Sequence, residues 1–129
     1  MNNSDADRLA RFAAIESRYR PQACDFTVRA VEVTVARLKK PRHLTAVELL
    51  DGIAEFARGE FGVFDAEVFD AWGVKSPSDF GNIVYSLIGA GMLSAGENDR
   101  REDFDIERPL TLPPERPHIK STAGIPKID

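Results

Sequence analysis

Hydrophobic residues recur along most of the chain at intervals of three and four, the spacing of one face of an α-helix. This spacing predicts five helices, over residues 5–18, 21–39, 45–60, 64–72 and 77–90. The last has a complete apolar stripe, formed by Phe80, Ile83, Val84, Leu87 and Ile88. The second is apolar around most of its girth, which is typical of a helix at the centre of a bundle. We therefore expect a mainly α-helical protein.

Several of these helices carry end signals in the sequence. Thr45 and Glu48 have the spacing of a capping box, in which each side chain bonds the other residue's backbone N–H. Ser76 before Pro77 combines an N-cap with a proline in the first helical turn. Pro41 ends the second helix, because proline cannot continue the hydrogen-bond ladder.

The pattern changes after residue 90. Phe104 and Ile106 alternate with charged residues, as in a half-buried strand, and residues 96–99 have turn composition. We therefore expect a C-terminal β-hairpin, with residues 42–44 as a short strand beside it. Helices followed by a hairpin predict a winged-helix-like fold over residues 1–107.

In such a fold the 77–90 helix takes the recognition position. Its expected outward side chains are Asp79, Asn82, Tyr85 and Ser86. None of residues 77–93 is Lys or Arg, and the expected wing, residues 97–108, has a net charge of −3. This charge repels phosphate, so a winged-helix shape used for protein contact fits better than reading of a DNA groove.

Charge and proline separate a body from a tail. The chain of 129 residues has a net charge of −4, divided as −6 on residues 1–107 and +2 on residues 108–129. The second segment holds five of the eight prolines. Because proline removes amide donors and favours extended backbone, we expect one helical domain over 1–107 and an extended tail over 108–129 outside the packed core.

Composition also excludes several classes of protein. A single cysteine rules out an intramolecular disulfide framework and a Cys-rich zinc site. No apolar run approaches the roughly 18 residues of a membrane span, and the N-terminus is polar and acidic rather than a secretory signal. We therefore expect a cytoplasmic protein that does not enter a membrane.

Three stretches carry a family resemblance. They are RHLTAVELLDGIAEFARGEFG, WGVKSPSDFGNIVYSLIGAGMLS and REDF, in this order. Over about residues 9–106 the chain resembles an uncharacterised family of small bacterial proteins, a domain of unknown function. The resemblance implies no activity, cofactor or catalytic residue. Members of that family end soon after the REDF element, so the tail departs from their pattern.

Candidate catalytic and metal-binding residues have simpler structural interpretations. Cys24 lies among apolar neighbours, which favours a buried thiol over a nucleophile paired with His43. The acidic turn favours a solvated loop over a cation site; its members are Glu97, Asp99, Glu102 and Asp103. The aromatic residues expected in the core are Phe61, Phe64, Phe69 and Trp72.

One basic cluster stands at the end of the second helix. Its predicted partner-binding members are Arg37, Lys39, Lys40, Arg42 and His43. Cations there complement the helix dipole and aid solubility, which is one interpretation. The other is contact with an anionic partner, either an acidic protein surface or nucleic-acid phosphate.

The tail supplies the remaining predicted partner-binding residues. They are Leu110, Leu112, Pro113, Pro114 and Arg116. Such a segment is able to adopt polyproline II and dock on an aromatic groove of a partner.

The sequence thus favours a non-enzymatic interaction module that docks into a larger macromolecular assembly, partly through its C-terminal tail. The partner expected is another protein or a second copy of the chain. The alternative is a nucleic-acid-binding protein that uses the basic cluster and the basic tail. No cofactor, metal or small-molecule substrate is indicated.

Overall fold

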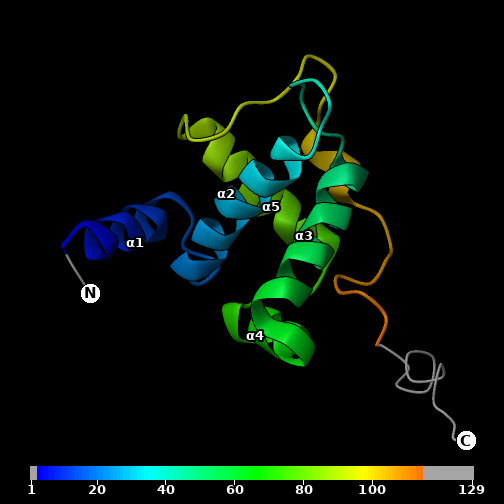
Figure 1. The fold of residues 1–129 in the computed structure, drawn as a ribbon. Coiled ribbons are helices and arrows are strands. Elements are labelled where there is room, and N and C mark those ends of the chain that lie inside the picture. The colour runs from blue at the N-terminus through cyan, green and yellow to red at the C-terminus, as the bar shows by residue number, and fades with distance from the viewer. Residues whose placement is uncertain (1–2, 115–129) are drawn as a thin grey trace, which may run out of the picture.

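Five α-helices and two short 3₁₀ helices follow one another in the computed structural model, which describes residues 3–114 (Figure 1). The α-helices are α1 (Asn3–Ile15), α2 (Pro21–Ala36), α3 (Ala46–Phe61), α4 (Asp65–Trp72) and α5 (Pro77–Gly89). The 3₁₀ helix η1 (Gly62–Phe64) precedes α4, and η2 (Arg101–Phe104) follows α5. The mainly α-helical prediction is confirmed, and the helix bounds differ from the expected ones by a few residues.

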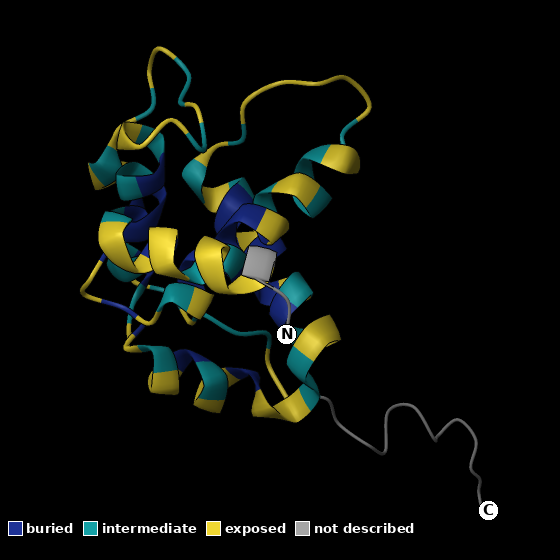
Figure 2. Ribbon diagram, turned by 90° about the vertical axis from the view of Figure 1, so that its left-hand side faces the viewer, coloured by how far each residue is buried: buried dark blue, intermediate teal, exposed yellow. Residues whose placement is uncertain are grey.

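Helix α2 occupies the centre, as its apolar girth predicted, and contacts α1, α3, α4 and α5. The buried residues lie on the inner faces of the helices around it (Figure 2). The ring of Phe26 stacks among neighbouring rings at centroid distances of 5.3 to 6.3 Å, those of Phe56, Phe61, Phe69, Trp72 and Phe80. Phe64 does not join this core, contrary to expectation, because η1 turns its side chain outward and leaves it 63% exposed.

The predicted C-terminal β-hairpin is wrong, because no strand forms among residues 3–114. The amide N–H groups of Asp103 and Asp105 donate to carbonyls three residues earlier, at 3.0 and 2.9 Å, which is 3₁₀ bonding. Phe104 is buried while Ile106 is 37% exposed, so the two do not share an inward face. An alternation of only three residues was too short to distinguish a strand from a helical turn.

The winged-helix-like prediction fails with the hairpin. Residues 42–44 are irregular and pair with no strand in the described part of the chain. Instead of a wing, η2 lies directly on α5 at Gly81, where an added Cβ would come within 2.6 Å of the Phe104 Cβ. Arg101 fastens this contact by donating to the carbonyl of Ser78 and to Asp105.

Three of the four expected outward side chains of α5, those of Asp79, Asn82 and Ser86, bind the α1–α2 region. Tyr19 Oη donates to Asp79 Oδ1 at 2.6 Å and accepts from Asn82 Nδ2 at 2.9 Å. Ser86 Oγ donates to Glu16 Oε1 at 2.7 Å. These hydrogen bonds use the polar face that a DNA-reading helix would keep for base edges.

The first part of the tail, residues 108–114, lies along α3 (Figure 1). Arg108 forms an ion pair with Asp51 at 2.8 Å, and Arg58 Nη2 donates to the carbonyl of Leu112 at 2.7 Å. This part of the tail packs on the domain, since side chains of α3 satisfy its backbone. The rest of the tail lies outside the described residues.

None of the helices between residues 3 and 114 is both long enough and apolar enough to cross a membrane.

Candidate functional site

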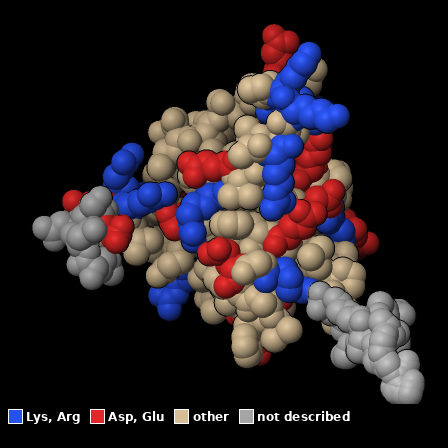
Figure 3. Space-filling view, viewed as in Figure 1, with Lys and Arg blue, Asp and Glu red and all other residues tan. Residues whose placement is uncertain are grey.

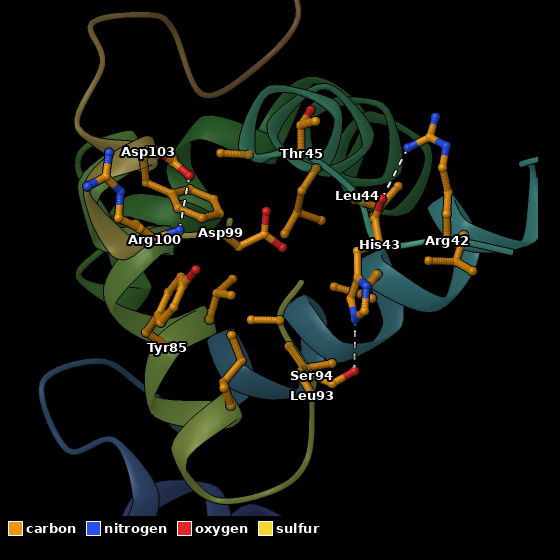
Figure 4. Close-up of a pocket in the computed structure, with 18 of the residues that line it drawn as sticks. Arg42, His43, Leu44, Thr45, Tyr85, Leu93, Ser94, Asp99, Arg100 and Asp103 are labelled. Carbon is orange, nitrogen blue, oxygen red and sulfur yellow. Dashed lines mark hydrogen bonds between the residues drawn. The ribbon is translucent and has the colours of Figure 1, made fainter. Parts of the chain in front are cut away.

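A cavity of about 520 Å³ opens on the surface between α2, the α2–α3 loop, the start of α3, the second half of α5 and the segment that leads into η2. We call it the α2–α5 cavity (Figure 4). Its volume is in the range of sites that hold a small molecule or a few side chains of a partner.

The floor of the α2–α5 cavity is apolar. Three helices supply it, through Val31 and Val35 of α2, Leu49 of α3, and Val84 and Ile88 of α5. The same stripe of α5 that packs the core continues to this cavity at its C-terminal end. Val31 and Ile88 are only partly buried, so the hydrophobic core reaches the surface here.

The mouth of the cavity carries polar groups from two loops far apart in the sequence. Ser94 Oγ lies 3.4 Å from His43 Nε2, which joins the segment after α5 to the α2–α3 loop. Figure 4 shows Tyr85 on the wall opposite His43, with the Asp99 carboxylate between them. Both loops are irregular, and this contact joins them.

Asp99 is held by its own turn. The Gly96 N–H donates to Asp99 Oδ2 at 2.7 Å, and the Asp99 N–H donates to the Gly96 carbonyl at 3.2 Å. The predicted turn over residues 96–99 is therefore present. The same Gly96 also borders His43, because a Cβ at position 96 would lie 3.5 Å from His43 Nδ1.

The α5–η2 wall of the cavity is acidic. The pKa of Tyr85 is raised, first because partial burial disfavours the phenolate, and then because Asp99, Asp103 and Glu102 lie near it. Arg100 also lines the cavity, but Figure 4 shows its guanidinium directed away from the Asp99 carboxylate.

The predicted basic cluster does not form one patch of unpaired charge. Arg37 binds Glu55 at 2.8 Å. Figure 3 shows that basic and acidic side chains are interspersed over the face it displays. Arg42 makes a two-pronged pair with Glu48 at 2.8 and 2.9 Å. His43, which also belongs to the basic cluster, lines the α2–α5 cavity.

The Glu48 side chain both pairs with Arg42 and caps the start of α3. Its carboxylate accepts from Arg42 and from the Thr45 N–H, while Thr45 Oγ1 accepts from the Glu48 N–H, so the predicted capping box is present. Hydrogen bonds from Arg42, then from Thr45, lower the pKa of Glu48 to about 2.

The remaining members of the basic cluster, Lys39 and Lys40, are exposed and have no ion pair within residues 3–114.

The predicted tail residues lie away from the cavity. Leu110 packs against the core, and the carbonyls of Leu112 and Pro113 accept from Arg58 at 2.7 and 3.3 Å. Pro114 is exposed, and Arg116 lies outside the described residues. The structure thus brings only Arg42 and His43 of the predicted residues to the cavity.

Sequence reasoning did not identify Ser94 as a site residue. It placed Tyr85 on the outward face of the 77–90 helix and treated Asp99 as part of a solvated turn. No local pattern marks these residues, since Ser94 meets His43 across 51 positions of sequence. The turn composition at 96–99 was the one usable signal.

Two other chemical candidates have structural explanations. Cys24 is fully buried, and burial raises the pKa of its thiol to about 11; it does not line the cavity that His43 faces. Across residues 3–114, no group of three His, Cys, Asp or Glu side chains is placed to hold a metal ion, the acidic turn included.

Comparison of the chain with models of protein families, with curated protein sequences and with solved structures finds no match in any of the three. The resemblance to a bacterial family therefore stays a prediction.

Proposed function

We propose that this chain is a non-enzymatic interaction module that docks into a larger macromolecular assembly by taking apolar side chains of a protein partner into the α2–α5 cavity. The cavity itself supports this proposal: an apolar floor from three helices that opens to the surface and is rimmed by polar groups. Interface cores of this kind accept one or two large side chains and keep a polar rim. We also propose a cytoplasmic location.

The tail contributes to this proposal in a changed form. Leu110 packs against the core, and Arg58 of α3 donates to the carbonyls of Leu112 and Pro113, so this part of the tail is held on the domain. We propose that contact of the tail with a partner uses the exposed side chains of Pro113 and Pro114, together with Arg116.

Nucleic-acid binding is the less supported alternative. Arg37 and Arg42 are paired with Glu55 and Glu48, and the polar face of α5 binds α1 and Tyr19. Phosphate contacts dominate nucleic-acid affinity. Within the basic cluster, the exposed cations that have no ion pair in the described residues are Lys39 and Lys40.

The test is affinity purification from the source cell with three forms of the chain, each with and without nuclease. Ala95 is half-buried and lines the cavity, so Ala95→Phe fills the cavity from its rim. Ala14→Phe on the exposed face of α1 is the matched control. Circular dichroism and the thermal midpoint of both variants verify that the fold is kept.

We expect one protein to co-elute with the wild type and with Ala14→Phe, with or without nuclease, and to be lost with Ala95→Phe. Light scattering of the purified chain separates a second copy from a different partner. Equal capture by Ala95→Phe, or loss of all partners after nuclease treatment, would overturn the proposal.

A further inference from the structure

The Asp99 carboxylate is a charged group that points into the α2–α5 cavity (Figure 4). Its Oδ2 accepts from the Gly96 N–H at 2.7 Å, which fixes the direction of the side chain. The residue is only half-buried, and Figure 4 shows the carboxylate directed between Tyr85 and His43. Within the described residues it has no ion pair with Lys or Arg.

None of the arginines around the cavity forms an ion pair with this carboxylate in the described residues. Arg42 pairs with Glu48 and points away (Figure 4), and Arg101 pairs with Asp105 and does not line the cavity. Arg100 also points outward (Figure 4). The wall formed by α5 and η2 therefore keeps a negative charge beside an apolar floor.

An occupant that is only apolar would leave this carboxylate partly desolvated without a partner, which costs free energy. An anionic occupant would add repulsion to that cost. An occupant with a cation beside an apolar group matches both the Asp99 carboxylate and the apolar floor. A charge-assisted hydrogen bond from the cation offsets the desolvation of the carboxylate.

We propose that the protein segment bound in the α2–α5 cavity carries a Lys or Arg side chain that pairs with Asp99, next to an apolar side chain that fills the floor. This inference rests on the proposed function and specifies the chemistry of the partner. Long basic side chains suit the geometry, since their methylene stems pack along apolar surface while the charged end reaches the rim.

The test uses three capped peptides that share a central Leu-X-Phe sequence, in which X is lysine, glutamine or glutamate. Each is titrated into the ¹⁵N-labelled full-length chain, and amide shifts are followed at cavity residues such as Leu44, Tyr85 and Ala95. Titrations are repeated with Asp99→Asn, whose side-chain oxygen still accepts from the Gly96 N–H and so keeps the turn. Glu97→Gln, in the same turn but outside the cavity lining, is the matched control.

We expect the lysine peptide to shift the cavity amides and to bind about five- to tenfold more tightly than the glutamine peptide, with the glutamate peptide weakest. Asp99→Asn removes the preference for lysine, while Glu97→Gln retains it. Added salt weakens the lysine peptide more than the glutamine peptide, because the contact is ionic.

Equal binding of the three peptides, a preference that survives Asp99→Asn, or no cavity shift with the lysine peptide would each overturn the inference. The proposed function is judged separately. If Ala95→Phe still abolishes capture of the cellular partner while the peptides show no charge preference, the cavity is the docking site and its occupant is not cationic.

Discussion

The hydrogen-bonded carboxylate of Glu16 ties stability to pH and can be tested quantitatively. Glu16 is 4% exposed, and its carboxylate accepts from Arg18 N, Nε and Nη2 at 2.8 to 2.9 Å and from Ser86 Oγ at 2.7 Å. The side-chain hydrogen bonds from Arg18, then the one from Ser86, lower the pKa of Glu16 from 4.5 to about 2 against the opposing effect of burial. This network fastens the end of α1 to α5.

The lowered pKa of Glu16 determines the sign and the size of its pH-dependent contribution to the unfolding free energy. A carboxyl group whose pKa is lower in the folded state stabilises that state above the unfolded pKa and loses the contribution as pH falls through the folded pKa. A fall of this size corresponds to about 3 kcal/mol at neutral pH and about half of that near pH 3. The window of change thus runs from about pH 5 down to about pH 2.

The assay is urea unfolding of the wild type and Glu16→Gln at several pH values between about 7 and 3. We expect the difference in unfolding free energy between the wild type and Glu16→Gln to be largest at neutral pH. It should narrow below pH 5, because protonation of Glu16 makes the wild-type side chain neutral, as glutamine already is. Glu67→Gln, at an exposed position of α4, is the matched control and should show little difference. A Glu16→Gln difference that stays constant from pH 6 to pH 3 would refute the reasoning.

Three further predictions concern packing. Gly81→Ala places a Cβ within 2.6 Å of Phe104, so it should lower the unfolding free energy measured in urea by about 1–3 kcal/mol. Gly59→Ala in α3 has open space around the new Cβ and should raise the unfolding free energy by about 0.5–1 kcal/mol. Equal effects of the two variants would contradict the η2–α5 contact. Arg58→Met removes the donors to the tail carbonyls, so limited proteolysis should cut the tail faster than in the wild type, and an unchanged rate would place the tail elsewhere. Cys24 is buried with a pKa of about 11, so a thiol reagent at neutral pH should label it only after denaturant unfolds the chain, and rapid native labelling would disprove its burial.

The helices were predictable because their determinants are local. Thr45 caps α3 with its own neighbour Glu48, and the apolar stripe from Phe80 onward needs only the 3.6-residue period. The Val and Thr residues of α2 have β propensity, yet they are helical because the bundle surrounds them. The hydroxyl of buried Thr27 is satisfied within the helix, since it donates to the Ala23 carbonyl.

The C-terminal segment was not predictable in this way. Strand and 3₁₀ turn both fit the short alternation at Phe104 and Ile106. The contact of Phe104 with Gly81 decided between them, and that contact joins residues 23 positions apart. A residue pattern records which side chains are apolar, but not which partner they meet.

The sequence by itself determined the helical order, the caps, the turn at residues 96–99 and the division of charge, since each follows from neighbours within a few residues. Tertiary structure alone decided where the polar side chains of α5 point, which arginines remain unpaired, and that His43, Ser94 and Asp99 surround one apolar cavity. The reason is physical: hydrogen bonds and ion pairs between distant segments form only after packing of the helices has fixed the distances between them.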